Sequence, residues 1–232
     1  MAKEERMTIK ISFRPDLSVL PPAQKIIWNK LIAVPENYVL YGGTAIALQL
    51  GHRSSIDFDF FSSDHADSDH LYSVVYSLLG PLEIIQSRKN TLSIITYSDD
   101  PVKLSFFWGI KTGRVKPPRI AEDNGIQVAS LQDLFGHKLK TILQRVEAKD
   151  YRDIACLLKS GFPLELGLSC VLSFWPHAPI QEIVRALAYF QEGDFSDLSE
   201  ADKQVLIKAC SNISYTNVAR LPLDSHALST AS

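Results

Sequence analysis

The sequence predicts a protein of the α/β (α+β) class, with a small mixed sheet flanked by helices and a helical domain behind it. Two observations lead to this prediction. Up to about residue 125, segments with the polar–apolar alternation of strands are interspersed with segments of helical periodicity, and only helical periodicity follows. We therefore expect residues 1–125 to form an α/β domain and residues 126–232 to form a helical domain that completes a cleft between them.

The first part opens with a helix, because two prolines precede an apolar stripe at helical spacing. Glycine-containing and polar turns separate the segments that follow. In chain order we expect a helix at 21–34, a strand at 37–43, a helix at 44–50, a strand at 54–61, a helix at 68–80 and strands at 82–88, 91–98 and 102–109. A basic connection comes next, either an exposed loop or a contact for RNA or a nucleotide; it carries Lys111, Arg114, Lys116 and Arg119.

In the second part, Ser130 and Asp133 form an S-x-x-D capping signature that opens a helix. Helical periodicity predicts helices at 131–146, 150–158, 164–172, 180–190 and 201–210. The tail "RLPLDSHALSTAS" carries no periodic pattern, and we expect it to be frayed.

The composition sets limits on function. Hydrophobic residues make up 46% and charged residues 22% of the 232 residues, with a formal net charge of −2, which excludes wholesale disorder and a basic nucleic-acid coat protein. The three cysteines are not spaced like those of a disulfide framework or a zinc ribbon. With no signal-peptide pattern at the start and no apolar run of about 20 residues, the sequence predicts a cytoplasmic protein without membrane contact.

Two carboxylates lie in the predicted strand "SSIDFDFF". Asp57 and Asp59 are two residues apart, so both side chains project from one face of the strand while phenylalanines project from the other. Carboxylates held side by side repel each other unless a cation lies between them, and Mg²⁺ prefers such oxygen ligands. The alternative is that the two aspartates form the solvent face of an edge strand.

A glycine turn precedes these carboxylates by 13 residues or more. Gly42 and Gly43 end a strand and open a helix, and Thr44 adds a hydroxyl there. The N–H groups at a helix start, reached closely over glycine, suit a phosphate, although any strand-to-helix turn can use glycine. The helix between them is just long enough to bring the chain back. The glycine turn, as a phosphate-binding group, and the two aspartates, as metal ligands, can then face the same space.

A third group is cationic. Lys138, Arg145 and Lys149 fall within roughly 40° of one another on a helical wheel that continues through this region, a stripe suited to a triphosphate. The alternative is a solvated helix face, with Glu147 and Asp150 as local ion-pair partners.

The segment "YGGTAIALQLGHRSSIDFDFF" resembles the signature of the AbiEii/AbiGii-type nucleotidyltransferase toxins, a branch of the DNA polymerase β-like nucleotidyltransferase superfamily. In that family a Gly-Gly-[Ser/Thr] turn opens a helix, and a His-Arg-x-Ser segment leads to an Asp-x-Asp metal pair. A lysine and an arginine followed by a Lys/Arg-Asp-x-x-Asp element, here "KDYRD", complete the resemblance, which covers roughly residues 35–160.

The resemblance implies a role for each matching residue. Asp57 and Asp59 would hold Mg²⁺, and Gly42, Gly43 and Thr44 would hold the phosphates of an NTP. The residues implied to support or bind the phosphates are Arg53, Ser54 or Ser55, Lys138 and Arg145, and we expect Lys149 to join them because it lies on the same cationic stripe. Asp153, or less fittingly Asp150, would assist catalysis.

The implied function is transfer of an NMP from an NTP to an acceptor hydroxyl, such as that of a tRNA, by a toxin that has a separate antitoxin partner and acts in growth inhibition or phage defence. One residue departs from the pattern of the wider superfamily, because Ser105 stands where a third carboxylate is expected. The alternatives are therefore a nucleotide- or RNA-binding module that has lost the chemistry, and a kinase-like phosphotransferase on the same scaffold.

Overall fold

A single mixed sheet organises the fold. The structure is a computed structural model that describes residues 11–191, 193 and 195–230. Within these residues eight strands form the order β1-β7-β8-β2-β3-β6-β5-β4. The strands are β1 (Ile11–Phe13), β2 (Val39–Tyr41), β3 (Phe58–Phe61), β4 (Leu82–Arg88), β5 (Thr91–Thr96), β6 (Lys103–Phe107), β7 (Arg119–Ala121) and β8 (Gln127–Val128).

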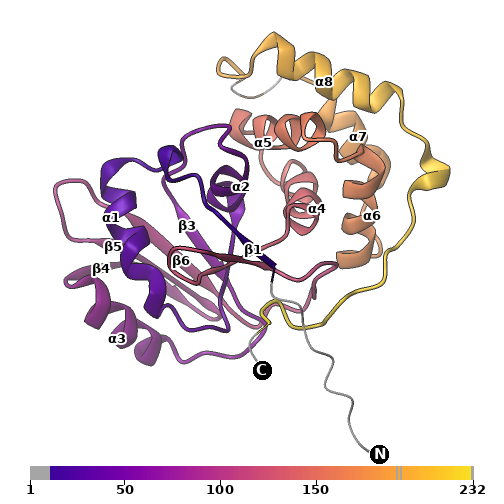
Figure 1. The fold of residues 1–232 in the computed structure, drawn as a ribbon. Coiled ribbons are helices and arrows are strands. Elements are labelled where there is room, and N and C mark those ends of the chain that lie inside the picture. Colours follow the sequence, from indigo (N-terminus) through magenta and orange to yellow (C-terminus); the bar gives the residue numbers. More distant parts are fainter. Residues whose placement is uncertain (1–10, 192, 194, 231–232) are drawn as a thin grey trace, which may run out of the picture.

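The α-helices flank this sheet. They are α1 (Pro22–Lys30), α2 (Gly42–Leu50), α3 (Ser68–Leu79), α4 (Leu131–Thr141), α5 (Ala148–Lys159), α6 (Leu164–Phe174), α7 (Ile180–Leu187) and α8 (Glu200–Ser211). Figure 1 shows α1 and α3 together on one side of the molecule, and α4 to α8 gathered on the other. The mixed α/β class predicted from the sequence is confirmed.

The two faces of β3 have different surroundings, which explains why buried and partly exposed side chains alternate along this strand. Phe58 and Phe60 are fully buried, and the ring of Trp28 from α1 stacks on Phe58 with centroids 6.2 Å apart. The intervening Asp59 and the following Phe61 therefore lie on the opposite face, toward α4. Beside β3, the parallel strand β6 places Ser105 directly opposite Asp59.

The predicted helix at 131–146 is wrong in its last part, residues 142–146. The helix α4 ends at Thr141, a turn follows, and α5 begins only at Ala148 after the N-cap Glu147. Tertiary ion pairs hold this turn, because Asp150 of α5 binds both Lys138 of α4 and Arg145 of the turn. The helical periodicity of the sequence cannot predict such a contact between two helices.

Three short strands were not predicted. β1, β7 and β8 have only two or three residues each, too few for alternation to be visible in the sequence. β8 pairs with β2 and β7, so the sheet extends past residue 125, and one hydrophobic core runs from β1 to α8. The domain boundary at residue 125 stays a prediction, and strand β8 follows it in the sequence.

The tail is held in place rather than frayed as far as the structure describes it, up to residue 230; residues 231 and 232 lie outside the described residues. The guanidinium of buried Arg114 binds the carboxylate of Asp224 at 2.8 Å and donates to the carbonyls of Ala227 and Leu228 at 3.1 and 3.2 Å. The prediction of an exposed or RNA-contacting loop is therefore wrong for Arg114, whose hydrogen bonds are used inside the protein.

No single helix among residues 11–191, 193 and 195–230 has both the length and the apolar character to cross a membrane. The pair α5 and α6 reaches the required composition only when joined across a 120° bend.

Candidate active site

The two predicted carboxylates share a cavity. Asp57 lies just before β3 and Asp59 within it, and both line a cavity of about 840 Å³ between the sheet and the later helices. Burial raises the pKa of Asp59, and the neighbouring charge of Asp57 raises it further against the opposing effect of Lys103 and Lys138. Charged carboxylates are therefore costly here unless a cation joins them.

The donor set fits Mg²⁺. In the part of the chain that the structure describes, no group of three or more His, Cys, Asp or Glu side chains is placed to hold a metal ion. A pair of carboxylates whose remaining partners are water and substrate phosphates is the mode of binding typical of Mg²⁺. The residues that would hold it are Asp57 and Asp59.

The start of α2 lies against this pair. Strand β2 runs directly into α2, whose N-cap Tyr41 provides no side-chain hydrogen bond. As in any α-helix, the first N–H groups have no acceptor within the helix, and here Gly42, Gly43 and Thr44 line the cavity. Gly42 has φ +76°, and a Cβ atom on it would lie 2.9 Å from Oδ2 of Asp59. Glycine thus brings the helix start next to the carboxylates.

A side chain at Gly43 would collide with Arg53 and crowd Asp153, which lie behind the helix start. Its Cβ would lie 2.1 Å from Nη2 of Arg53 and 3.2 Å from Oδ2 of Asp153. We expect Gly43→Ala to lower the nucleotide transfer that the resemblance implies by about tenfold to a hundredfold, because displaced groups at the helix start would fit phosphates less well. Steady-state transfer rates measure the effect, and a urea midpoint shows whether the fold is kept. Full activity in the folded variant would contradict a role for this close approach.

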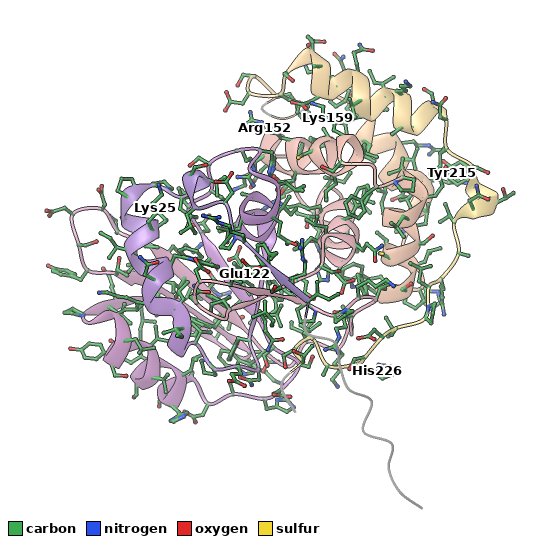
Figure 2. All side chains as sticks on the ribbon, viewed as in Figure 1. Lys25, Glu122, Arg152, Lys159, Tyr215 and His226 are labelled. Carbon is green, nitrogen blue, oxygen red and sulfur yellow. The ribbon has the colours of Figure 1, made fainter. Side chains whose placement is uncertain are left out.

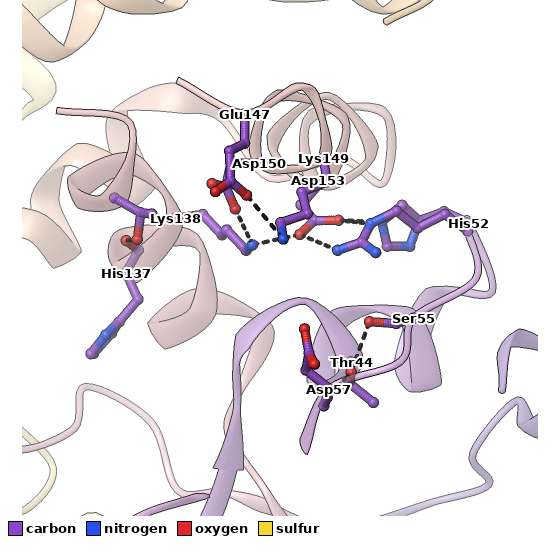
Figure 3. Close-up of polar contacts among 12 residues, drawn as sticks. Thr44, His52, Ser55, Asp57, His137, Lys138, Glu147, Lys149, Asp150 and Asp153 are labelled. Carbon is purple, nitrogen blue, oxygen red and sulfur yellow. Dashed lines mark hydrogen bonds and ion pairs between the residues drawn. The ribbon is translucent and has the colours of Figure 1, made fainter. Parts of the chain in front are cut away.

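The hydroxyls of Thr44 and Ser55 tie α2 to the beginning of β3. Thr44 Oγ1 donates to the carbonyl oxygen of Asp57 and lies 2.7 Å from Ser55 Oγ (Figure 3). Both residues line the cavity, as the sequence predicts for phosphate-binding groups. The hydrogen bonds also fix the position of Asp57 relative to the helix start.

Behind the cavity lies a buried charge network. Lys138 on α4 places its Nζ 2.5 Å from Oδ1 of Asp150 and 2.7 Å from Oδ2 of Asp153, and both aspartate side chains are fully buried (Figure 3). Arg53 binds both carboxylate oxygens of Asp153, at 2.6 and 2.9 Å. These contacts join the loop before β3 to α4 and α5.

Asp153 is the centre of this network. In addition to Lys138 and Arg53, His52 lies with Nε2 2.7 Å from Oδ1 of Asp153. Burial favours a raised pKa for Asp153, but Lys138, His52 and Arg53 together outweigh it and lower the pKa. Lys138 and Arg53 line the cavity, whereas Asp153 lies behind them. Its predicted part in catalysis stays a prediction, and its contacts are those of a positioning residue.

The three predicted cations line the same cavity, but they lie on different elements and not on one helix as expected. Because α4 ends at Thr141, they do not share one helical stripe: Lys138 lies on α4, Arg145 in the turn and Lys149 on α5. Arg145 binds Asp150 at 2.8 Å, and Lys149 binds Glu147 at 2.9 Å. Both side chains are nearly half exposed and remain accessible to a substrate phosphate.

Other cations of α5 point elsewhere. Arg152 and Lys159 lie on the side of α5 that faces α8 (Figure 2), where Lys159 binds Asp202 at 2.6 Å. The basic character of the cavity therefore comes from a selected set of residues rather than from α5 as a whole.

The buried aspartates make stability depend on pH. The network lowers the pKa of both Asp150 and Asp153 relative to the unfolded chain, where aspartate titrates at about 3.9. Their contribution is therefore present above about pH 4 and is lost as pH falls through the lower folded pKa values. We expect the urea midpoint to fall steeply below about pH 4. The dependence will be shallower in Asp153→Asn, and an equal slope in both proteins would contradict the assignment.

Several cavity residues were not identified from the sequence. Lys103, Ser93 and Gln86 line the cavity from β6, β5 and β4, and His137 does so from α4. Burial lowers the pKa of His137 to about 4, so its ring is neutral at pH 7, and it packs against Tyr41 at 4.9 Å. The alternation of β6 contained the signal for Lys103, since it lies on the same face as Ser105.

Known proteins resemble this chain in sequence and in fold. A family model described as "Nucleotidyl transferase AbiEii toxin, Type IV TA system" matches residues 30–212. An uncharacterised protein of Aquifex aeolicus (strain VF5) is 29% identical over 164 residues, which cover 69% of this chain and 77% of that protein.

Two solved structures have a similar fold. MenT4, a nucleotidyltransferase toxin from Mycobacterium tuberculosis H37Rv, aligns with a TM-score of 0.57 at 13% identity and covers 84% of this chain and 85% of its own. A structure from H. pylori aligns with a TM-score of 0.54 at 17% identity, over 81% and 90% of the two chains. With the family match extending over most of the sequence, the chain belongs to the AbiEii nucleotidyltransferase toxin family.

Proposed function

We propose that this protein transfers an NMP from an NTP to a hydroxyl of an RNA acceptor such as tRNA, with Mg²⁺ held by Asp57 and Asp59. One observation carries the proposal. The helix start at Gly42 and Gly43 lies directly against Asp59, so a phosphate-binding group and a metal-binding group face the same cavity.

The cavity supplies groups for the phosphates of a nucleoside triphosphate and for their metal ion. The backbone N–H groups at Gly43 and Thr44 bind phosphate oxygens, and Arg53, Lys138, Arg145 and Lys149 neutralise their charge. Mg²⁺, when bound, supplies charge neutralisation at the reacting phosphate. Asp57 and Asp59 would hold this ion on the side of the cavity formed by β3.

The reaction is an in-line displacement. The acceptor oxygen forms a bond to the α-phosphorus while the bond from that phosphorus to the bridging oxygen breaks. Pyrophosphate leaves with the electron pair, and the proton of the acceptor hydroxyl passes to water. Lys138 and Arg145 stabilise the negative charge that develops on the leaving group.

Asp153 and Asp150 act through other residues in this proposal. They hold Lys138, Arg53 and Arg145 in the orientations that the phosphates require, by contacts of 2.5–2.8 Å. In a buried network such contacts fix geometry more than they add attraction for the substrate.

The family context extends the proposal to the cell. Membership of a toxin family is consistent with a separate antitoxin protein, with growth inhibition or phage defence as the outcome, and with a cytoplasmic site of action where NTPs and RNA are present.

A second candidate is a module that binds nucleotide or RNA without transferring it. The observation that favours it is Ser105, which lies opposite Asp59 in the position where a third carboxylate would help to activate the acceptor.

One experiment separates the candidates. Purified protein is incubated with Mg²⁺, total cellular RNA and each of four α-³²P-labelled NTPs, and products are resolved on a denaturing gel. Label on an RNA band that disappears in the Asp57→Asn/Asp59→Asn double variant supports the transferase. NTP binding without label supports the binding module, and release of NDP rather than pyrophosphate indicates a kinase-like reaction.

A further inference from the structure

Polar side chains form a continuous row across the sheet, starting from the metal-binding carboxylate. Ser105 of β6 lies opposite Asp59 of β3, Ser93 of β5 lies opposite Ser105, and Gln86 of β4 lies opposite Ser93. All four residues line the cavity. We call Ser105, Ser93 and Gln86 the polar row.

The polar row differs from the rest of the cavity in charge and in hydrogen bonding. Its three members are neutral, whereas the opposite wall carries Lys138, Arg145 and Lys149. Ser93 and Ser105 are only 6% and 3% exposed, and Ser93 Oγ donates to Ser105 Oγ at 3.2 Å. Ser105 accepts this bond and keeps its own O–H group for another acceptor. Hydroxyls at such buried positions are costly unless they find partners, and the cavity is where a partner can reach them.

The position of the polar row relative to the start of α2 indicates which reactant the row would contact. The start of α2 continues from β2, on one side of β3, whereas β6, β5 and β4 lie on the other side. In an in-line displacement the attacking and leaving oxygens lie on opposite sides of the phosphorus. If pyrophosphate leaves toward the start of α2, the acceptor approaches over β6, and therefore over the polar row.

We propose that the polar row is the acceptor subsite and that it binds the vicinal 2′,3′-diol of a terminal ribose on RNA. This inference rests on the proposed function. Two neighbouring hydroxyls, each a donor and an acceptor, match the hydroxyls of Ser93 and Ser105 and the amide of Gln86. Lys103, which lies on the same face of β6, is placed to meet a phosphate of the incoming strand.

The first test compares kinetic constants in three single variants. We expect Ser93→Ala and Gln86→Ala to raise KM for RNA by about five- to tenfold, the effect of about one lost hydrogen bond, with KM for NTP unchanged. Ser87→Ala is the matched control, because Ser87 is exposed and its side chain points to the opposite face of β4 from Gln86. A rise in KM for NTP instead would assign the row to the ribose of the nucleotide and overturn the proposal.

The second test does not require transfer. Binding of a fluorescent RNA is measured by anisotropy without NTP, for one oligonucleotide ending in a ribose diol and one ending in a 2′-deoxyribose. We expect the wild type and Ser87→Ala to prefer the diol, and Ser93→Ala to lose the preference. Equal binding of both ends by the wild type overturns the acceptor subsite. A diol preference in a protein that transfers no label would instead show that the proposed function fails while the subsite stands.

Discussion

Replacing Asp59 with asparagine is expected to lower nucleotide transfer by at least about a thousandfold, because a neutral amide is a much weaker ligand of Mg²⁺ than a carboxylate and the ion would then no longer be held where it neutralises the reacting phosphate. The variant is also expected to fold at least as stably as the wild type. Burial and Asp57 raise the folded-state pKa of Asp59, so its charged form costs stability as pH rises through that pKa. Asparagine removes this cost.

The measurements are the initial rate of label transfer and the urea midpoint at pH 7. Asp99→Asn is the matched control, because Asp99 is an exposed aspartate in the loop between β5 and β6. Loss of transfer with an unchanged or higher midpoint separates a role in the reaction from a role in folding. If Asp59→Asn transferred label as fast as Asp99→Asn, the proposed metal site would be wrong.

The largest effect on stability is expected for Lys138→Met, about 3–5 kcal/mol of unfolding free energy. The ammonium group of Lys138 is the shared partner of Asp150 and Asp153, whose side chains are fully buried. Removing it leaves buried negative charge without this partner, whereas the methionine side chain still fills most of the volume. Urea unfolding at pH 7 measures the difference.

Lys149→Met provides the comparison. Lys149 also forms an ion pair, with Glu147 at 2.9 Å, but both side chains are at least 40% exposed, so a change below about 1 kcal/mol is expected. In the double variant Lys138→Met/Asp150→Asn part of the lost stability should return, because one of the two buried carboxylates that lose their lysine partner is then neutral. Equal effects of Lys138→Met and Lys149→Met would contradict the buried network.

The local part of the site could be predicted from the sequence. Alternation in one strand places Asp57 and Asp59 on one face, and the glycine turn marks the start of α2, because both features depend only on neighbouring residues. The cationic group was predicted on a wrong geometry, since a break in the helix at Thr141 depends on ion pairs between separate elements. The polar row was not predicted either, because it exists only through the register of four strands.

The burial of Arg114 makes the position of α4 depend on a remote segment of the chain. The guanidinium of Arg114 is satisfied by Asp224, 110 residues further along, and by the carbonyls of residues 227–229. The N–H groups of the next two residues, Val115 and Lys116, bind Asp133 of α4, and α4 also carries Lys138. Removing residues 224–230 would therefore leave a buried guanidinium without these acceptors beside the start of α4. The helix that faces the cavity is thus held in part by contacts far from it in the sequence.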